Sequence, residues 1–302
     1  MKIRLLAVLL AIAAIVGVVL GTHPGVALSP SLASSPVQTF PHHYVGVVSY
    51  NVAAFDRGCG CTPNVAVHYL HIGGNGRQDI DVARAILAAG AVPMLELEPY
   101  GMSLARISSG SEDTWLAGFA REVAGLHAPI IMSFAPEPNG DWYSWGYPDV
   151  APSAYVSAWR HVVTVFRKAG PRAIKWAWIM NVNFSGSENI RLLWPGQAYV
   201  NLLGLDGYVT APATFAGFFG PTIVSMRAIS SDPLLITETA GAPSVGKLHA
   251  LREITAGVAQ YGLVGFIWFD IRQHGNIRRQ DWRLEDEPAA LTLFARDVKA
   301  VR

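Results

Sequence analysis

The residues of this chain best suited to chemistry lie where an apolar run stops at a carboxylate. Glu137 follows the run Ile130–Phe134 closely, and Trp142, Tyr143 and Trp145 come soon afterwards. A charged group at the end of a buried strand is costly unless it has a partner or a function. Aromatic rings beside a carboxyl group suit a sugar, because its C–H faces pack on flat apolar surfaces while its hydroxyls need polar partners. The segment alone fits equally well a strand-end Glu held by local hydrogen bonds beside a Trp-rich packing loop.

Polar residues follow several other apolar runs at comparable positions. They are Glu98, Asn181, Asp206, Glu238 and Asp270. A single acid at the end of a strand often caps the following helix and then needs no other function. If the runs are parallel strands of one barrel, however, these groups converge on its carboxyl-terminal rim, where barrel enzymes build their active sites. So many polar groups on one rim are hard to explain by capping alone.

The apolar runs alternate with amphipathic segments, a pattern typical of repeated βα units. We expect strands at Tyr44–Tyr50, Val65–Ile72, Val92–Leu97, Ile130–Phe134, Ile174–Met180, Val200–Leu205, Leu234–Thr237 and Val264–Phe269. Among the helices between them, one is expected to be capped by Ser111, with Asp113 in its first turn. This pattern predicts an α/β fold, a single (β/α)8 TIM barrel, rather than an open doubly wound sheet.

Residues 1–33 have the pattern of a signal peptide followed by the start of a tether. Met1–Arg4 supplies a basic start, and Leu5–Leu20 is an apolar run that is short for a membrane span of about 20 residues. We therefore expect a secreted, extracellular protein, with an uncleaved signal anchor as the alternative. Residues 34–302 have the usual length of one barrel domain.

The composition of the chain limits the kinds of binding partner that we expect. The formal net charge is +1 and charged residues make up 15% of the chain, so nothing indicates nucleic acid or an acidic surface. The sequence contains no basic run and no phosphate-cradling glycine motif. We expect no nucleic-acid partner, no stable membrane partner unless the leader stays uncleaved, and a monomer.

Cys59 and Cys61 are the only cysteines of the chain. An exported location favours oxidation, and each cysteine has only the other as an intramolecular partner. Gly60 between them makes so short a bridge feasible, although the small loop that it closes adds little stability. A zinc site is disfavoured because no further ligands follow at a suitable spacing. We expect a local disulfide and no metal.

Taken together, these segments resemble glycoside hydrolase family 26, a family of clan A (β/α)8 barrels known mainly for endo-β-1,4-mannanases. The similar segments span nearly the whole chain after the leader and are Leu95–Pro99, Glu137–Trp142, Trp194–Gly196, Gly204–Tyr208, Ile236–Glu238, Trp268–Asp270 and Asp281–Arg283. The resemblance implies that residues 34–302 are a catalytic domain in which Glu137 is the acid/base and Glu238 the nucleophile of a retaining mechanism. Glu98 and Asp206 are expected to order the site rather than to react.

The resemblance also implies residues that contact the sugar. Trp142 matches a sugar-stacking tryptophan, Tyr208 a tyrosine that hydrogen-bonds the nucleophile, and Trp268 the floor under the reacting sugar. Each of these rings also fits a packed core position. Asn139 is expected to bond a sugar hydroxyl or to orient the acid/base, and simple turn chemistry explains it almost as well.

One position departs from the family pattern. The family usually has His immediately before the acid/base, in contact with the −1 sugar, and here that position is Pro136, whose ring offers no hydrogen bond. We expect a secreted, cofactor-independent endo-glycoside hydrolase that cleaves a β-1,4-linked mannan or glucomannan as its polysaccharide partner. The alternatives are the same mechanism on another β-glycan, such as a mixed-linkage β-glucan or an exopolysaccharide, and a non-catalytic polysaccharide-binding barrel.

Overall fold

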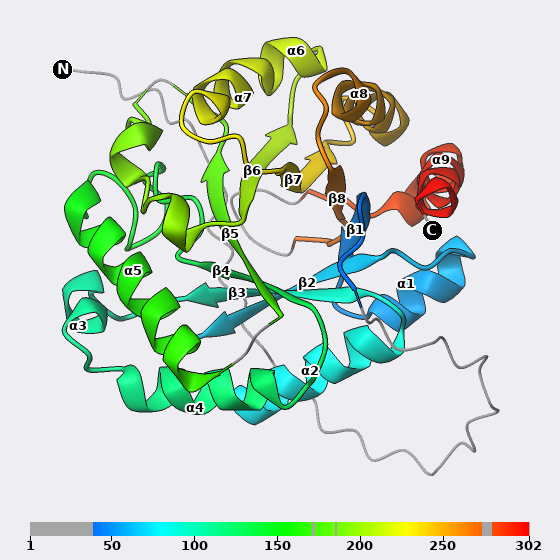
Figure 1. The fold of residues 1–302 in the computed structure, drawn as a ribbon. Helices are drawn as coiled ribbons and strands as arrows, with labels where there is room; N and C mark the ends of the chain where they lie inside the picture. Colours follow the sequence, from blue (N-terminus) through cyan, green and yellow to red (C-terminus); the bar gives the residue numbers. More distant parts are fainter. Residues whose placement is uncertain (1–38, 171–172, 185, 274–279, 302) are drawn as a thin grey trace, which may run out of the picture.

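The chain folds as a closed barrel of parallel strands surrounded by helices (Figure 1). The computed structural model describes residues 39–170, 173–184, 186–273 and 280–301. The strands follow one another around the barrel from β1 to β8, and β8 pairs with β1 from Tyr44↔Gly265 to Val48↔Phe269. The predicted single (β/α)8 barrel is confirmed. The predicted leader, residues 1–33, lies outside the described residues.

Each predicted strand is present, with small changes at its ends. The strands are β1 (Tyr44–Val48), β2 (Val65–His71), β3 (Val92–Glu98), β4 (Ile130–Phe134), β5 (Ile174–Asn181), β6 (Leu202–Val209), β7 (Leu234–Gly241) and β8 (Gly265–Phe269). The largest change is that β6 and β7 continue past their expected ends at Leu205 and Thr237. Their pairing continues to Val209↔Gly241. Asp206 and Glu238, two of the polar residues expected at the barrel rim, therefore lie within regular strands.

Helices cover the outside of the barrel. The α-helices are α1 (Val52–Cys59), α2 (Gly76–Ala88), α3 (Leu104–Ser108), α4 (Asp113–Ala124), α5 (Pro152–Ala169), α6 (Phe215–Phe218), α7 (Gly220–Arg227), α8 (Lys247–Gln260) and α9 (Pro288–Ala300). Short 3-10 helices lie at η1 (Ile190–Leu193), η2 (Gln197–Tyr199) and η3 (Leu284–Asp286). Over the described ranges, no helix is both long and apolar enough to cross a membrane.

Helix α4 shows how the sequence places a covering helix. Its apolar stripe is buried at Leu116, Phe119, Ala120 and Val123. The predicted cap at Ser111 was wrong, because the residue before the helix is Glu112, whose side chain makes no capping hydrogen bond. The N–H of Ser111 instead donates to the carbonyl of Arg106, so Ser111 still belongs to the turn that ends α3.

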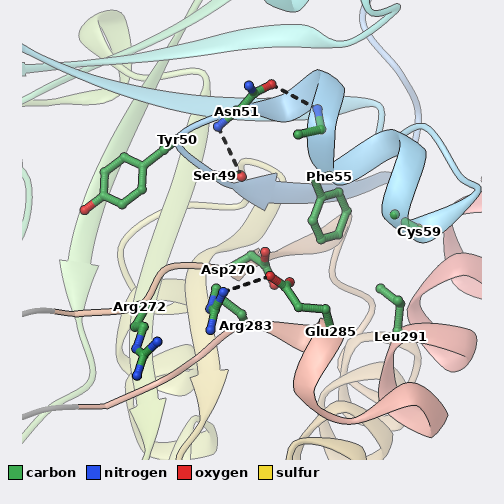
Figure 2. A pocket seen from close by; sticks show the side chains of 12 residues that line it. Ser49, Tyr50, Asn51, Phe55, Cys59, Asp270, Arg272, Arg283, Glu285 and Leu291 are labelled. Carbon is green, nitrogen blue, oxygen red and sulfur yellow. Dashed lines mark hydrogen bonds and ion pairs between the residues drawn. The ribbon is translucent and has the colours of Figure 1, made fainter. Parts of the chain in front are cut away.

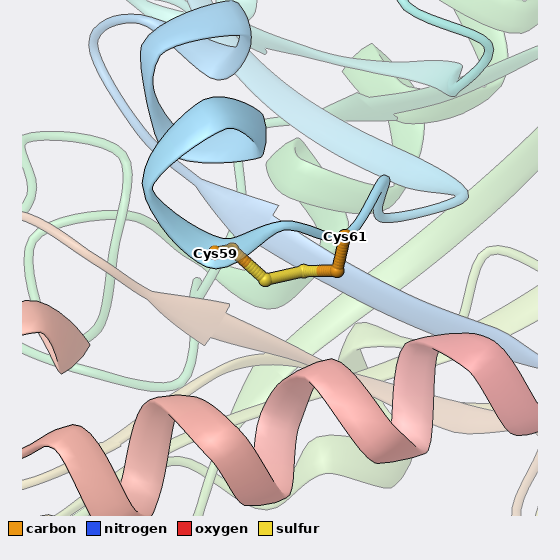
Figure 3. Close-up of a disulfide and its surroundings, with 2 residues drawn as sticks. All are labelled: Cys59 and Cys61. Atoms are coloured by element: carbon orange, nitrogen blue, oxygen red, sulfur yellow. A yellow bond between two sulfur atoms is a disulfide. The ribbon is translucent and has the colours of Figure 1, made fainter.

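Helix α1 follows β1 and packs against α9. The Asn51 side chain caps it by accepting from the N–H of Ala54 at 2.9 Å, and Phe55 packs edge-on against Phe294 of α9, with ring centroids 5.6 Å apart. The helix ends at Gly60, which has a left-handed φ of 62° that glycine adopts without strain. Directly around this turn, Cys59 and Cys61 form a disulfide (Figure 3).

Candidate active site

Glu137 stands on an unusual turn directly after β4. Both Ala135 and Glu137 have positive φ, 46° and 53°, a region that residues with a Cβ seldom occupy. The turn is held from both sides, because the N–H of Ala135 donates to the carbonyl of Leu97 at 2.9 Å and that of Glu137 donates to Ile179 at 3.0 Å. Backbone strain of this kind persists where the surrounding structure enforces it, and it clusters at functional sites. The neighbouring strands thus fix the direction in which the Glu137 side chain leaves the barrel wall.

The carboxyl group of Glu137 has a donor on each oxygen. The indole N–H of Trp142 donates to Oε2 at 2.6 Å, and Nδ2 of Asn181 donates to Oε1 at 2.5 Å. Glu137 is 7% exposed, so these are contacts of a buried group that keeps a narrow opening. Trp142 is half-buried and lies beside Phe184, with ring centroids 5.6 Å apart. Trp142 therefore positions the carboxyl group as well as offering a partly open ring face.

Asn139 supports Glu137 indirectly. Its Nδ2 donates to the carbonyl of Asn181 at 2.9 Å, and its Oδ1 accepts from the N–H of Asn181 at 3.0 Å. It is 0% exposed. With its amide engaged in this way and no open surface, Asn139 is not placed to bond a sugar hydroxyl, and the expected substrate contact is corrected. Its geometry fits the other expected role, orienting the acid/base, which it does through Asn181.

Glu238 lies within β7 and accepts a hydrogen bond on each oxygen. The hydroxyl of Tyr69, on β2, donates to Oε1, and the hydroxyl of Tyr208, on β6, donates to Oε2. The sequence prediction placed Tyr208 here, but it missed Tyr69. Two phenol hydroxyls that arrive from separate strands fix the orientation of this carboxylate and favour its ionised form.

A bulge aligns β6 with β7 at the level of Glu238. The register shifts between Leu205 and Asp206, and Asp206 then pairs with Glu238 across the strands. Asp206 accepts from the hydroxyl of Thr237 at 2.6 Å and is buried. Bulges often re-aim side chains beside active sites, and here the bulge brings Asp206 into the carboxyl cluster that it was expected to support.

The barrel mouth holds a cluster of buried carboxyl groups. Its members are Glu96, Glu98, Glu137, Asp206 and Glu238. The ion pairs formed among the described residues include none of them. Burial, with the charges of Glu238 and Glu137, raises the pKa of Glu98 to about 8. Burial likewise raises the pKa values of Glu96 and Asp206 well above their ordinary range, so the cluster retains protons at neutral pH.

The two central carboxyl groups share the effect of burial but differ in their neighbours. Burial raises the pKa of both Glu137 and Glu238. The negative charge of Glu238 raises the pKa of Glu137 further, and the donors Asn181 and Trp142 lower it, whereas the hydroxyls of Tyr208 and Tyr69 lower that of Glu238. Both groups have a pKa of about 7. Near neutral pH the pair therefore offers both a carboxylate and a protonated carboxyl group, the two forms that a nucleophile and a general acid need.

Trp268 occupies a different place from the expected one. It is 0% exposed, and its indole N–H donates to the carbonyl of Trp282 at 2.9 Å. The segment after β8 covers it, and Trp282 packs on Tyr208 with ring centroids 5.4 Å apart. The expected sugar-facing floor is corrected to a core position. Trp268 braces Trp282, which in turn supports the tyrosine bonded to Glu238.

The aromatic residues next to Trp142 also pack inward. Tyr143 and Trp145 stack with ring centroids 4.3 Å apart and are both buried. The indole N–H of Trp145 donates to the carbonyl of Pro136 at 2.8 Å and so holds the turn before Glu137. Of the three aromatic residues that follow Glu137, Trp142 alone keeps a partly exposed ring.

The sequence prediction missed three members of the site: Tyr69, Glu96 and Asn181. Asn181 was recognised as a strand-end residue but received no role, although it ends β5 just as Glu98 ends β3. Tyr69 and Glu96 are register partners on β2 and β3. Their positions two residues before the strand ends were the signal, because side chains at alternate positions of a strand point to the same side.

Comparison with known proteins adds a family match. A family model described as glycosyl hydrolase family 26 matches residues 114–277, more than half of the chain. Endoglucanase H of Acetivibrio thermocellus is 27% identical over 234 residues, which make up 72% of this chain and 25% of that protein. The chain thus spans about a quarter of the length of this curated relative.

Solved structures share the fold at low sequence identity. A GH26 β-mannanase from Bacteroides ovatus has a TM-score of 0.60 at 15% identity, covering 86% of this chain and 88% of its own. A modular endo-β-1,4-mannanase from Cellulomonas fimi has a TM-score of 0.60 at 17% identity, covering 82% and 70%. A β-mannanase from a symbiotic protist of the termite Reticulitermes speratus has a TM-score of 0.60 at 12% identity, covering 85% and 93%.

Proposed function

Because the chain belongs to glycoside hydrolase family 26, we propose that it cleaves a β-1,4-linked mannan or glucomannan within the chain, with retention of anomeric configuration. The observation that carries the proposal is the pair of buried carboxyl groups at the barrel mouth, each with a donor on both oxygens. Tyr69 and Tyr208 donate to Glu238, and Trp142 and Asn181 donate to Glu137. In the proposed reaction Glu238 starts ionised and Glu137 starts protonated.

The mechanism proceeds by two displacements at the anomeric carbon. Glu238 attacks this carbon and forms a covalent glycosyl ester, while Glu137 gives its proton to the departing glycosidic oxygen. Glu137, now ionised, takes a proton from a water molecule that attacks the ester and releases Glu238. This course requires the two carboxyl groups to lie about 5–5.5 Å apart on opposite faces of the sugar.

Mannan is supported as substrate by the family and by the names of proteins that share the fold. The Bacteroides ovatus and Cellulomonas fimi structures are of β-mannanases, and the termite-symbiont β-mannanase was solved with a gluco-manno-oligosaccharide. Another β-glycan is the second candidate. Pro136 stands where the family usually has His, and the curated relative is named an endoglucanase.

Release of reducing ends from mannan, glucomannan, mixed-linkage glucan, xylan and cellulose tests the substrate. Purified Glu137→Ala and Glu238→Ala proteins serve as blanks. We expect activity on mannan or glucomannan, with the β-anomer formed first in the proton NMR spectrum of the products. Initial formation of the α-anomer rejects retention. Binding of these glycans without any release of reducing ends indicates a non-catalytic barrel.

Export is proposed on two sequence features, the leader pattern of residues 1–33 and the paired cysteines, since disulfides persist mainly in oxidising compartments. Expression of the full chain in a secreting host tests it. The mature protein is expected in the medium with its N-terminus near residue 34, and full-length protein retained in the membrane fraction argues for an uncleaved anchor.

A further inference from the structure

A cavity outside the carboxyl cluster lies between the segments that follow β1 and β8 (Figure 2). Its volume is about 570 Å³. Helix α1 lines it with Phe55 and Gly58, helix α9 contributes Leu291, and the segment after β8 contributes Asp270 and Arg283. We call it the β1–β8 pocket. It opens on the carboxyl-terminal side of the barrel, because Ser49 and Asp270 directly follow β1 and β8.

The lining of the β1–β8 pocket combines an apolar base with planar polar groups. Phe55 and Leu291 supply apolar surface, and Asp270 and Arg283 supply a carboxyl group and a guanidinium. Tyr50 at the rim is 81% exposed, an unusual position for a large aromatic side chain. An aromatic face beside planar hydrogen-bonding side chains is a combination that fits a pyranose ring and its hydroxyls.

The arginines of the β1–β8 pocket are already paired with carboxylates. Arg283 donates to Asp281 at 2.8 and 2.7 Å and pairs with Glu285 at 3.1 Å, and Arg272 lies 3.5 Å from Asp281. Burial raises the pKa of Asp270 to about 7, so near neutral pH this group both donates and accepts hydrogen bonds. A site whose guanidinium groups are already paired with carboxylates favours an uncharged ligand over an anion.

The β1–β8 pocket and the candidate active site lie at the same end of the barrel. Ser49 and Asp270 of the pocket directly follow β1 and β8, as Glu137 follows β4. The two sites are also joined by packing, because Trp282, next to Arg283 in the chain, lies against Tyr208 with ring centroids 5.4 Å apart. The pocket is therefore on the face of the barrel that a polysaccharide bound to the two central carboxyl groups would occupy.

We propose that the β1–β8 pocket is an accessory carbohydrate site that holds one neutral pyranose residue of the polysaccharide, with Tyr50 stacking on the ring. This inference rests on the proposed function, since the ligand is the same glycan. A site of this kind strengthens the binding of long chains and leaves the reaction of short substrates unchanged, because a short substrate does not reach it.

A pocket-filling substitution gives the sharpest test. A Cβ placed on Gly58 meets no atom within 4 Å, so Gly58→Phe extends a ring into the open space, and Gly58→Ala is the matched control. Tyr50→Ala removes the rim ring, and Leu192→Ala, which truncates a side chain that is 55% exposed on η1, is its control. Binding is measured in Glu238→Ala protein by affinity electrophoresis in galactomannan, glucomannan and mixed-linkage glucan.

Gly58→Phe and Tyr50→Ala are each expected to weaken the binding of the long glycan by roughly 2- to 10-fold, the range for one lost aromatic contact. With Glu238 intact, kcat/KM on an aryl oligosaccharide should not change. Equal binding by both variants and their controls overturns the accessory site. If Gly58→Phe does not fold, as judged by circular dichroism, Tyr50→Ala decides the question. Because the binding assay needs no turnover, failure of the hydrolase proposal appears separately, as wild-type protein that releases no reducing ends.

Discussion

Asn181 donates a 2.5 Å hydrogen bond from its Nδ2 to Oε1 of Glu137, although the two residues lie 44 positions apart. Asn181 ends β5, Glu137 follows β4, and Asn139 holds the Asn181 backbone through two further hydrogen bonds. Two asparagines on neighbouring barrel segments thus set the direction of the acid/base carboxyl group. This arrangement favours the carboxylate form of Glu137, which has to accept a proton from water in the second half of the reaction.

Replacing Asn181 with Ala should therefore slow the reaction and change its pH dependence. Loss of a hydrogen bond to a charged group costs about 1.5–3 kcal/mol, which is roughly a 10- to 150-fold fall in kcat/KM if the bond is strongest in the transition state. Since the Asn181 hydrogen bond lowers the pKa of Glu137, its loss should move the alkaline limb of the pH–rate profile upward. A lower rate with an unmoved alkaline limb would mean that Asn181 acts on the fold rather than on the proton of Glu137.

The two central carboxyl groups should respond differently to removal. Glu238→Ala should abolish turnover on every substrate, and azide should restore it with an activated glycoside to give a glycosyl azide of inverted configuration. Glu137→Ala should harm substrates with poor leaving groups most, because only these need protonation. The comparison uses aryl glycosides with phenols of graded pKa. Equal losses across the series would remove Glu137 from the acid role.

The sequence predicted the barrel and the placement of Glu137 and Glu238 at its mouth, because both features depend on patterns with a fixed period or position. Apolar runs set the strands, and acids at strand ends collect on one rim by the geometry of a parallel barrel. Contacts across the barrel could not be read in this way. The hydroxyl of Tyr69 on β2 donates to Glu238 on β7. The local sequence of β2 does not indicate which strand faces it across the barrel.

The covering of Trp268 illustrates the same limit. The sequence placed Trp268 correctly in β8, but its ring was expected to face the sugar and is instead buried. The exposure depends on how the segment after β8 folds back, where Arg272 bridges to Asp281 and places Trp282 over the strand end. Such a fold-back results from long-range packing rather than from a periodic pattern. Likewise, the sequence around Asn139 is compatible with a turn residue, a sugar contact or a residue that orients the acid/base. Only the hydrogen bonds of its amide to the Asn181 backbone distinguish among these roles.

The two tyrosines bound to Glu238 should contribute to the acidic limb of the pH–rate profile. Both hydroxyls lower the pKa of Glu238, so Tyr69→Phe and Tyr208→Phe should each move the acidic limb upward and reduce kcat/KM by roughly 10- to 150-fold. Tyr155→Phe, a change at a buried tyrosine of the outer helix α5, is the matched control. If Tyr69→Phe behaves like this control, then the hydroxyl from β2 has no part in holding Glu238.

Glu98 should make the stability of the protein depend on pH. Burial raises its pKa from the ordinary 4.5 to about 8, so the folded protein gains stability from this group at low pH and loses that stability as pH rises from about 4.5 to about 8. Glu98→Gln removes this loss and should be more stable than wild type at pH 8, on the order of a few kcal/mol, with a smaller difference at pH 5. Urea unfolding at both pH values measures it, with Glu122→Gln on the surface of α4 as control. A difference that stays constant between pH 5 and pH 8 would contradict the predicted protonation of Glu98.

Pro136 should determine part of the substrate preference. It lies between Ala135 and Glu137, and its carbonyl accepts from Trp145 at 2.8 Å, a contact that a substitution at this position can retain. If an imidazole here holds a hydroxyl of the −1 sugar in the family pattern, its absence removes one hydrogen bond, worth about 1–3 kcal/mol or roughly 5- to 150-fold in rate. Pro136→His should then raise the hydrolysis of mannan without a matching rise on mixed-linkage glucan. Pro136→Ala separates the effect of the imidazole from that of losing the rigid ring. Unchanged selectivity in a Pro136→His protein that unfolds at the wild-type temperature would mean that another side chain already serves the −1 sugar, and that Pro136 carries no information about the substrate.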